Sequence, residues 1–305
     1  SRAARRVAEL SERKALMESR IDRARPVPAD LVLRLRRIPS IPPCRVVAGV
    51  ASYAAREPVF AQSVASILPQ VDHLFVFLND YASVPAFLDD ARITVFRSQD
   101  YWNLSAIGKT FALGDLDDCY FFSLDDDILF PPDYVERMLA TMHKYGDKVG
   151  VAVHGSVLPE HPGWYFERSV GYPFQAALAS DRFVNLIGSG TFAFRTSVLR
   201  ARFEDFLPHV MVDLRFSILA KDQGVPLVCV ARPRMWLTGL ANQDGLYQVM
   251  RIGVTVHTTE CIAHAPWGYE RYRQIVAEAL PPHLLELSPD QQRALDLDVE
   301  FLAGL

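Results

Sequence analysis

An alternation of strand-like and helix-like segments in the first third of the sequence is the feature that most constrains its fold. Apolar runs at 45–50, 73–78 and 93–96 are typical of buried strands. Between the first two, the segment 58–68 opens with a proline and repeats its large apolar residues at helical spacing. This order is typical of a parallel sheet with right-handed crossover connections. We therefore predict an α/β fold in which helices flank a mostly parallel sheet.

Three consecutive aspartates, Asp125, Asp126 and Asp127, follow the apolar and aromatic run 120–124. They stand where a buried strand would leave its sheet, and open α/β sheets bind ligands at the carboxyl ends of their strands. A hard divalent cation would lower the repulsion among three carboxylates and would keep positions open for substrate phosphates. A short acidic cluster can also decorate a solvated turn or cap the next helix, so the triplet alone leaves both interpretations open.

The alternation continues beyond the triplet. A helical pattern at 133–146 and an apolar run at 149–153 place the triplet on a strand-to-helix connection inside one α/β unit. The segment 154–181 is loop-like and rich in aromatic residues, which can stack on sugar rings or fill the core. The pattern G-x-G-x-x-A at 188–193 precedes strand-like residues and not a helix, so it does not predict a dinucleotide site.

Asp213 stands at the start of a further helical segment that runs to Gly224, and a strand-like run follows at 227–230. Asp213 could be the N-cap of this helix or a functional acid. Beyond this strand the pattern is irregular, which indicates a loop that covers a site. A last helical piece follows the loop. His257 and His264 lie in this C-terminal extension, and each is either a hydrogen-bonded structural residue or a metal ligand.

The composition fits a globular protein. With 305 residues, 50% of them apolar, the chain can bury a substantial core as one large domain or two small ones. It has no run of 18 consecutive apolar residues and no signal-peptide core, so we expect a soluble, cytoplasmic protein. Its four widely spaced cysteines fit reduced core thiols better than disulfides or zinc ligands. The net charge of −4 argues against general binding of nucleic acid.

The charge is unevenly spread. The first 40 residues hold eleven Arg and Lys against five Asp and Glu, a net charge of +6 that leaves −10 for the remainder. Within them the segment 7–21 predicts a basic amphipathic helix, which can lie on the inner face of an anionic membrane, dock on a partner or pack on its own domain. The abrupt basic start also suggests a piece of a longer, multidomain chain. We divide the chain into a basic helical extension (1–40), a main domain (41–280) and a C-terminal tail (281–305).

Four features carry a resemblance to a known family. In chain order they are Ser52-x-x-x-Arg56-x-Pro58 with the helix ending at Leu68, then Asn79-Asp80, then the acidic triplet, and then the segment 190–199 followed by Asp213-Leu-Arg215 and Gly224. Over roughly residues 44 to 230 the chain resembles the nucleotide-sugar-dependent glycosyltransferases of the GT-A fold, closest to the family 2 type. That family has an acidic pair before its late helix, and here Val212 replaces the first acid and leaves Asp213 as the second.

The resemblance implies a GT-A (Rossmann-like) domain that binds a nucleoside diphosphate sugar, with UDP as the expected nucleotide. Asp125 and Asp127 would bind Mn²⁺ or Mg²⁺ as a D-x-D motif. Asp213 would be the general base of an inverting transfer to a saccharide or lipid-linked saccharide acceptor. The donor-binding residues that the resemblance implies are Ser52, Tyr53, Arg56, Asp80, Lys109 and Asp126. By analogy we expect a role in the synthesis of a bacterial capsule or another surface polysaccharide.

Two other classes of function stay open. The chain could be an inactive nucleotide-sugar-binding module of a larger assembly, although the intact acidic triplet speaks against that. It could also be a sugar nucleotidyltransferase, but that class normally has a glycine-rich phosphate loop after the first strand, and the segment 51–55 has no glycine.

Overall fold

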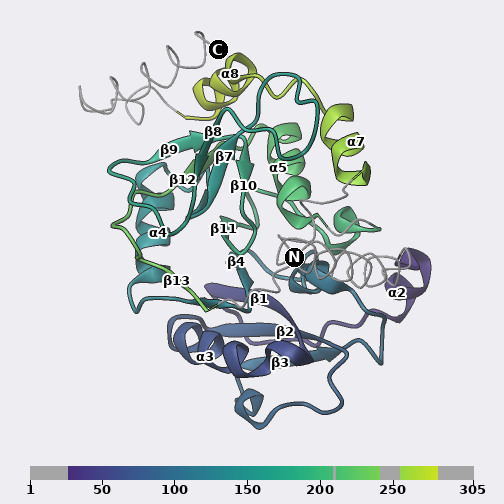
Figure 1. Ribbon diagram of the computed structural model, residues 1–305. Coiled ribbons are helices and arrows are strands. Elements are labelled where there is room, and N and C mark those ends of the chain that lie inside the picture. The colour runs from purple at the N-terminus through teal and green to yellow at the C-terminus, as the bar shows by residue number, and fades with distance from the viewer. Residues whose placement is uncertain (1–26, 209–210, 241–254, 281–305) are drawn as a thin grey trace, which may run out of the picture.

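A computed structural model describes residues 27–208, 211–240 and 255–280 (Figure 1). The strands of its main sheet are β1 (Val46–Tyr53), β2 (His73–Asn79), β3 (Ile93–Arg97), β4 (Tyr120–Asp125), β6 (Gly150–Ala152), β9 (Arg182–Val184), β11 (Thr191–Arg195) and β12 (Leu227–Cys229). A three-stranded sheet consists of β7 (Gly155–Val157), β8 (Val170–Tyr172) and β10 (Leu186–Ile187), and a ribbon pairs β5 (Ile128–Leu129) with β13 (Thr238–Gly239). The α-helices are α2 (Ala29–Leu35), α3 (Glu57–Ile67), α4 (Tyr134–Lys144), α5 (Val212–Asp222), α7 (Thr255–Ala263) and α8 (Tyr269–Ala279). The 3-10 helices are η1 (Ala54–Arg56), η2 (Leu68–Gln70), η3 (Ala86–Leu88), η4 (Ser105–Thr110) and η5 (Phe203–Phe206).

The eight-stranded main sheet has the order β3-β2-β1-β4-β11-β6-β12-β9, from the bottom to the top of Figure 1. The strands β3, β2, β1 and β4 pair in parallel, as do β6 and β12. Strand β11 is antiparallel to both of its neighbours, and β9 is antiparallel to β12. The predicted α/β fold with a mostly parallel sheet flanked by helices is therefore confirmed, with β11 inserted in the opposite direction.

The register of the strands brings several strand ends to one edge of the sheet. Tyr53 at the carboxyl end of β1 is opposite Asn79 of β2, and Ala51 is opposite Asp125 of β4. The amino end of the antiparallel β11 lies at the same edge, because Thr191 is opposite Leu124. Side chains from four strands can therefore meet at this edge, which is where parallel α/β sheets bind their ligands.

Helix α3 confirms the helix predicted after the first strand. It has Pro58 in its first turn and buries Phe60, Val64 and Ile67. The segment between β3 and β4 contains the 3-10 helix η4, which packs closely on the sheet. A Cβ at Gly49 of β1 would lie 2.0 Å from a backbone oxygen of η4, so a glycine in β1 is required for this approach. The contact fixes η4, which carries Lys109, against β1.

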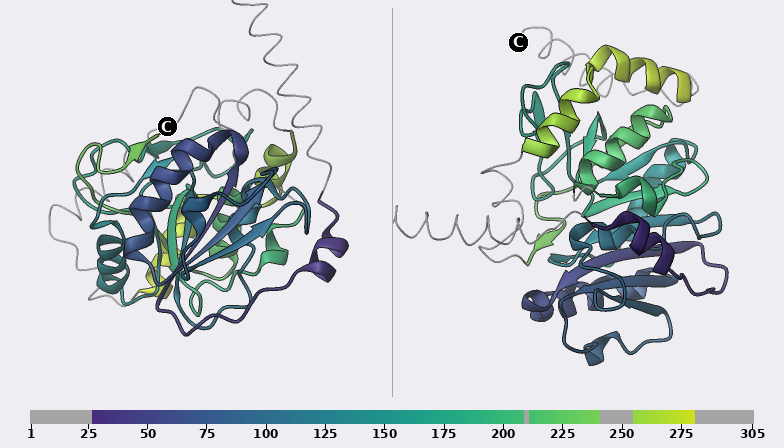
Figure 2. Two further views of the ribbon diagram at one scale, coloured as in Figure 1. Left: turned by 90° about the horizontal axis from the view of Figure 1, so that it is seen from below. Right: turned by 90° about the vertical axis from the view of Figure 1, so that its right-hand side faces the viewer.

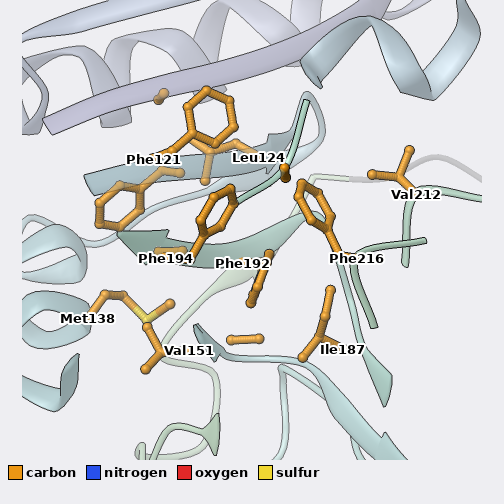
Figure 3. Close-up of a cluster of buried hydrophobic side chains, with 14 of the residues drawn as sticks. Phe121, Leu124, Met138, Val151, Ile187, Phe192, Phe194, Val212 and Phe216 are labelled. Carbon is orange, nitrogen blue, oxygen red and sulfur yellow. The ribbon is translucent and has the colours of Figure 1, made fainter. Parts of the chain in front are cut away.

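A cluster of phenylalanines joins β4, β11 and α5 (Figure 3). The ring of Phe216 in α5 lies 5.0 Å from that of Phe192 and 5.4 Å from that of Phe194, measured between centroids. Phe194 in turn lies 5.7 Å from Phe121 of β4. Burial of each such side chain contributes about 2 kcal/mol to stability. The cluster therefore holds α5 against β11 and β4.

Helix α2 and the residues after it pack on the core of the described chain. Val32 of α2 is fully buried in the main core. Arg36 donates from Nε to the carbonyl of Phe111 (2.8 Å) and from Nη2 to that of Leu113 (2.9 Å), and it pairs with Asp115. The predicted basic helix at 7–21 and the tail at 281–305 lie outside the described residues.

Helices α7 and α8 lie at the end of the molecule away from β3 (Figure 2). They occupy the region of the predicted C-terminal extension. Within the described ranges, no helix combines the length and the apolar character that crossing a bilayer requires.

Candidate functional site

Asp125 ends β4 with its carboxylate between a lysine and a glycine. Nζ of Lys109 forms an ion pair and hydrogen bond with Oδ1 of Asp125. On the other side, a Cβ at Gly190 would lie 1.9 Å from Oδ2 of Asp125, so a larger residue would displace the carboxylate. The backbone N–H of Asp125 also donates to the carbonyl of Gly190 (3.1 Å). The side chain is therefore held in place although 45% of it is exposed.

Asp126 and Asp127 share the guanidinium group of Arg56. Nη1 of Arg56 lies 2.5 Å from Oδ1 of Asp126 and 3.2 Å from Oδ2 of Asp127. Asp126 is only 3% exposed, and its Oδ2 has no hydrogen-bond partner among the described residues. Burial raises the pKa of Asp126, and the charge of Arg56 opposes that rise. The three carboxylates therefore differ in access, since Asp126 is buried against Arg56 while its two neighbours reach solvent.

The carboxylate of Asp127 lies where more positive charge would be favourable. Its pKa is raised to about 6, first by burial and then by the charge of Asp125, while Arg56 opposes the rise. A hard cation relieves both causes, because it binds the ionised carboxylates directly. No group of three or more His, Cys, Asp or Glu side chains in the described ranges is arranged to hold a metal ion. The assignment of Asp125 and Asp127 as ligands of Mn²⁺ or Mg²⁺ therefore stays a prediction.

The raised pKa predicts that Asp127→Asn stabilises the protein at neutral pH when divalent cations are removed. The pKa of this acid is higher in the folded than in the unfolded chain. Ionisation therefore costs stability, and wild-type stability falls as the pH rises from about 4 to 6. We expect Tm at pH 7.5 in EDTA to rise, with a gain of at most about 3 kcal/mol, and the gain to shrink towards pH 4.5.

A pH series of melting curves checks this expectation, with the exposed Asp117→Asn as the matched control. A lower Tm for Asp127→Asn at pH 7.5 would show that its contact with Arg56 outweighs the cost of the charge.

Of the predicted donor-binding residues at the end of β1, two are accessible and one is buried. Tyr53 and Arg56 are partly exposed, whereas Ser52 is buried. Oγ of Ser52 lies 3.0 Å from the hydroxyl of Tyr81. Burial raises the pKa of Tyr53 and raises the pKa of Tyr81 to about 12. Both phenols therefore stay protonated at neutral pH, and Tyr53 presents a neutral surface at the edge of the sheet.

Asn79 and Asp80, which are adjacent in sequence, have separate functions in the structure. The buried Asn79 accepts hydrogen bonds at Oδ1 from the backbone N–H groups of Leu104 (3.0 Å) and Ser105 (3.2 Å), so it holds the start of η4. Asp80 has a φ of 60° and is exposed. Its Oδ2 accepts from Nδ2 of Asn103 (2.7 Å). Asp80 thus presents a carboxylate at the edge of the sheet, as a donor-binding residue would.

Asp213 lies in the first turn of α5 and is not its N-cap, which is Met211. Its Oδ1 accepts hydrogen bonds from the backbone N–H (2.9 Å) and the hydroxyl (2.5 Å) of Ser189. Ser189 directly precedes Gly190, against which Asp125 packs. The turn from β10 to β11 therefore connects Asp213 to the acidic triplet, although 86 residues or more separate them in sequence.

His154 also belongs to this site, although no motif in the sequence singled it out. It follows β6, at the same end of the sheet as the triplet, and its carbonyl accepts from the N–H of Gly188 (2.9 Å). Burial is the main cause that lowers the pKa of His154, and the charges of Arg232 and Arg168 also lower it. The charges of Asp213 and Asp125 oppose this change. A signal was present, since His154 stands directly after a strand-like run, as the triplet does.

The two histidines considered as ligands are not placed at the triplet by any contact of the described side chains. His264 accepts at its backbone carbonyl from Nζ of Lys221 in α5. His257 lies in α7, but its side chain is outside the described residues.

Comparisons with known proteins give little beyond a general likeness. No model of a protein family matches the sequence, and neither does any curated protein. A crystal structure of S. aureus TarS 1-349 in complex with UDP-GlcNAc has 16% sequence identity and a TM-score of 0.44, over 85% of this chain and 81% of that one. A second structure of S. aureus TarS 1-349 has 15% identity and a TM-score of 0.42, over 85% and 79%. These values carry no conclusion about the chemistry of the present chain.

Proposed function

We propose that this protein is an inverting glycosyltransferase that moves a sugar from a nucleoside diphosphate sugar, with UDP as the nucleotide, to a saccharide acceptor. The observation that carries the proposal is the turn at Ser189 and Gly190. Ser189 holds one carboxylate, Asp213, and Gly190 packs against another, Asp125. An inverting transfer needs a base beside the attacking hydroxyl and positive charge beside the leaving diphosphate, and a metal ion held by carboxylates can supply that charge.

At the donor end, the charges suit a diphosphate. Asp125 and Asp127 would hold a Mn²⁺ or Mg²⁺ ion, which when bound supplies Lewis-acid stabilisation for the departing phosphate oxygens. Lys109 and Arg56 flank the two carboxylates and add positive charge beside them. Asp126 supports this arrangement, because its buried carboxylate holds the guanidinium group of Arg56 in place.

At the acceptor end, Asp213 can remove the proton from the attacking hydroxyl. Both hydrogen bonds from Ser189 go to Oδ1, so the proton would go to Oδ2. These bonds orient the carboxylate, and its partial exposure leaves room for an acceptor. The acceptor that we propose is a growing surface polysaccharide, such as a bacterial capsule, or a lipid-linked precursor of one. The basic segment before residue 27 would bring the enzyme to the inner face of the membrane where such precursors lie.

A thermal-shift panel tests the proposal. The probes are UDP, GDP, CMP and their sugars, each with and without Mn²⁺. We expect UDP and one UDP-sugar to raise Tm in the presence of Mn²⁺, because a ligand at 100 times its Kd stabilises the folded state by about 2.7 kcal/mol. An absence of any shift across the panel would refute donor binding, and an equal shift without Mn²⁺ would refute the metal site.

Two turnover assays separate the alternatives. An inactive binding module would bind the UDP-sugar without releasing UDP from it in the presence of Mn²⁺. A sugar nucleotidyltransferase would form a nucleotide sugar from a nucleoside triphosphate and a sugar phosphate. Its glycine-rich loop has no counterpart here, since the residues after Gly49 form the end of β1 and the helix η1.

A further inference from the structure

His154 is firmly placed by its backbone. Its N–H donates to Oγ1 of Thr191 at the start of β11 (3.1 Å), and its carbonyl accepts from the N–H of Gly188 (2.9 Å). A Cβ at Gly188 would lie 2.9 Å from Cβ of His154, so the two residues are in close contact. Three consecutive residues, Gly188, Ser189 and Gly190, therefore contact His154, Asp213 and Asp125 in turn.

The imidazole of His154 has hydrogen-bonding capacity to spare. Neither of its ring nitrogens bonds to another residue in the part of the chain that the structure describes. Burial lowers the pKa of His154, so the ring is neutral at neutral pH and offers one donor and one acceptor. A neutral ring of this kind suits a sugar hydroxyl, which can both donate and accept, better than it suits a phosphate.

The chemistry of the transfer defines what lies beside this ring. In a single in-line displacement, the sugar being transferred lies between the leaving diphosphate and the group that activates the acceptor. Those two positions are marked by Asp125 and Asp213, and the charges of both act on His154. We propose that His154 binds a hydroxyl group of the donor sugar and thereby selects which sugar the enzyme transfers. This inference rests on the proposed function.

The residues around His154 support such a sugar subsite. The ring of Phe174 lies 6.5 Å from the imidazole, measured between centroids. Phe174 also lies beside Gly239, whose neighbour Leu240 donates its N–H to the carbonyl of Asp127 (2.6 Å). An aromatic ring close to both His154 and Gly239 offers an apolar surface to the C–H face of a sugar.

Arg232 holds Phe174 in this position. Its guanidinium group is buried and donates from Nη2 to the carbonyls of Tyr172 (3.2 Å) and Pro173 (2.7 Å), directly before Phe174. The backbone of Arg232 also pairs with that of Leu178 on the far side of the turn. The segment that carries Phe174 is therefore tied at both ends, which keeps the apolar surface next to His154.

Calorimetric titration of UDP and of a UDP-sugar, both with Mn²⁺, tests the proposal. The UDP-sugar is whichever of UDP-GlcNAc, UDP-glucose and UDP-galactose gives the largest thermal shift. For His154→Ala we expect the Kd of UDP to stay within about twofold, and the Kd of the UDP-sugar to rise about tenfold, which is the loss of one good hydrogen bond. His154→Gln should recover part of this loss because its amide can bond to the same hydroxyl. The exposed His161→Ala is the matched control.

Each result has one meaning. An unchanged Kd of the UDP-sugar for His154→Ala overturns the proposal. An equal loss of UDP and UDP-sugar affinity also overturns it, because a merely structural role would weaken both. A wild-type protein that binds neither UDP nor any UDP-sugar overturns the proposed function itself. If UDP binds normally and only the role of His154 fails, the proposed function stands.

Discussion

Asp213→Asn should remove sugar transfer and leave donor binding intact. A positioned general base contributes about 10²- to 10⁴-fold to the rate, and an amide cannot take up the proton of the acceptor hydroxyl. The amide oxygen can still accept both hydrogen bonds from Ser189, so the turn and the start of α5 should keep their geometry. Release of UDP from the UDP-sugar, with water or a saccharide as the acceptor, measures the first effect, and calorimetric titration of UDP measures the second.

A matched control lies on the same helix. Asp222→Asn changes an exposed aspartate in the last turn of α5 and should leave both measurements unchanged. Wild-type turnover of Asp213→Asn would disprove its role as the base. A loss of UDP affinity together with turnover would mean that Asp213 acts through the structure of the site.

Asp127→Ala should abolish the contribution of the metal to donor binding. Asp127 and Asp125 are the accessible carboxylates of the triplet, and loss of one would leave a divalent cation with a single protein ligand. We expect the affinity for UDP in Mn²⁺ to fall at least about tenfold, or about 1.4 kcal/mol, to the value that wild type shows in EDTA. Titrations in Mn²⁺ and in EDTA measure the difference directly.

The comparison between the two conditions separates a metal ligand from a nucleotide contact. If Asp127 bound the nucleotide itself, Asp127→Ala would weaken UDP binding in EDTA as well. Asp117→Ala, an exposed aspartate shortly before β4, should behave like wild type in both conditions. We also predict that Asp127→Asn stabilises the metal-free protein. Asp127 would therefore bind the metal and, when no metal is bound, lower the stability of the folded state.

The sequence predicted those parts of the fold that depend on local patterns. Apolar runs and helical periodicity located β1, α3, β2 and β4, and the step from an apolar run to acids placed the triplet at the end of a strand. The antiparallel insertion of β11 could not be predicted, because it depends on pairing with β4 and β6 across a large sequence separation. The site at that strand, which includes Ser189 and His154, was hidden for the same reason.

The sequence also could not predict in which directions adjacent side chains point. Asp126 stands between two accessible aspartates, but the turn after β4 buries it against Arg56. Asn79 and Asp80 formed one motif in sequence, whereas Asn79 holds η4 and only Asp80 is exposed. The glycines at 188 and 190 did not predict a site because no local pattern shows which side chains will pack against them. The metal, the acceptor and the membrane contact stay predictions.

The turn that carries Ser189 and Gly190 has a consequence for how such an enzyme can change over time. It belongs to the start of a central strand, so the spacing between Asp125 and Asp213 depends on the packed sheet and not on surface loops. Loops around the site can then gain or lose residues and fit new sugars or new acceptors. The spacing between Asp125 and Asp213 stays the same. Such a scaffold can therefore acquire new substrate preferences while the two carboxylates keep their positions.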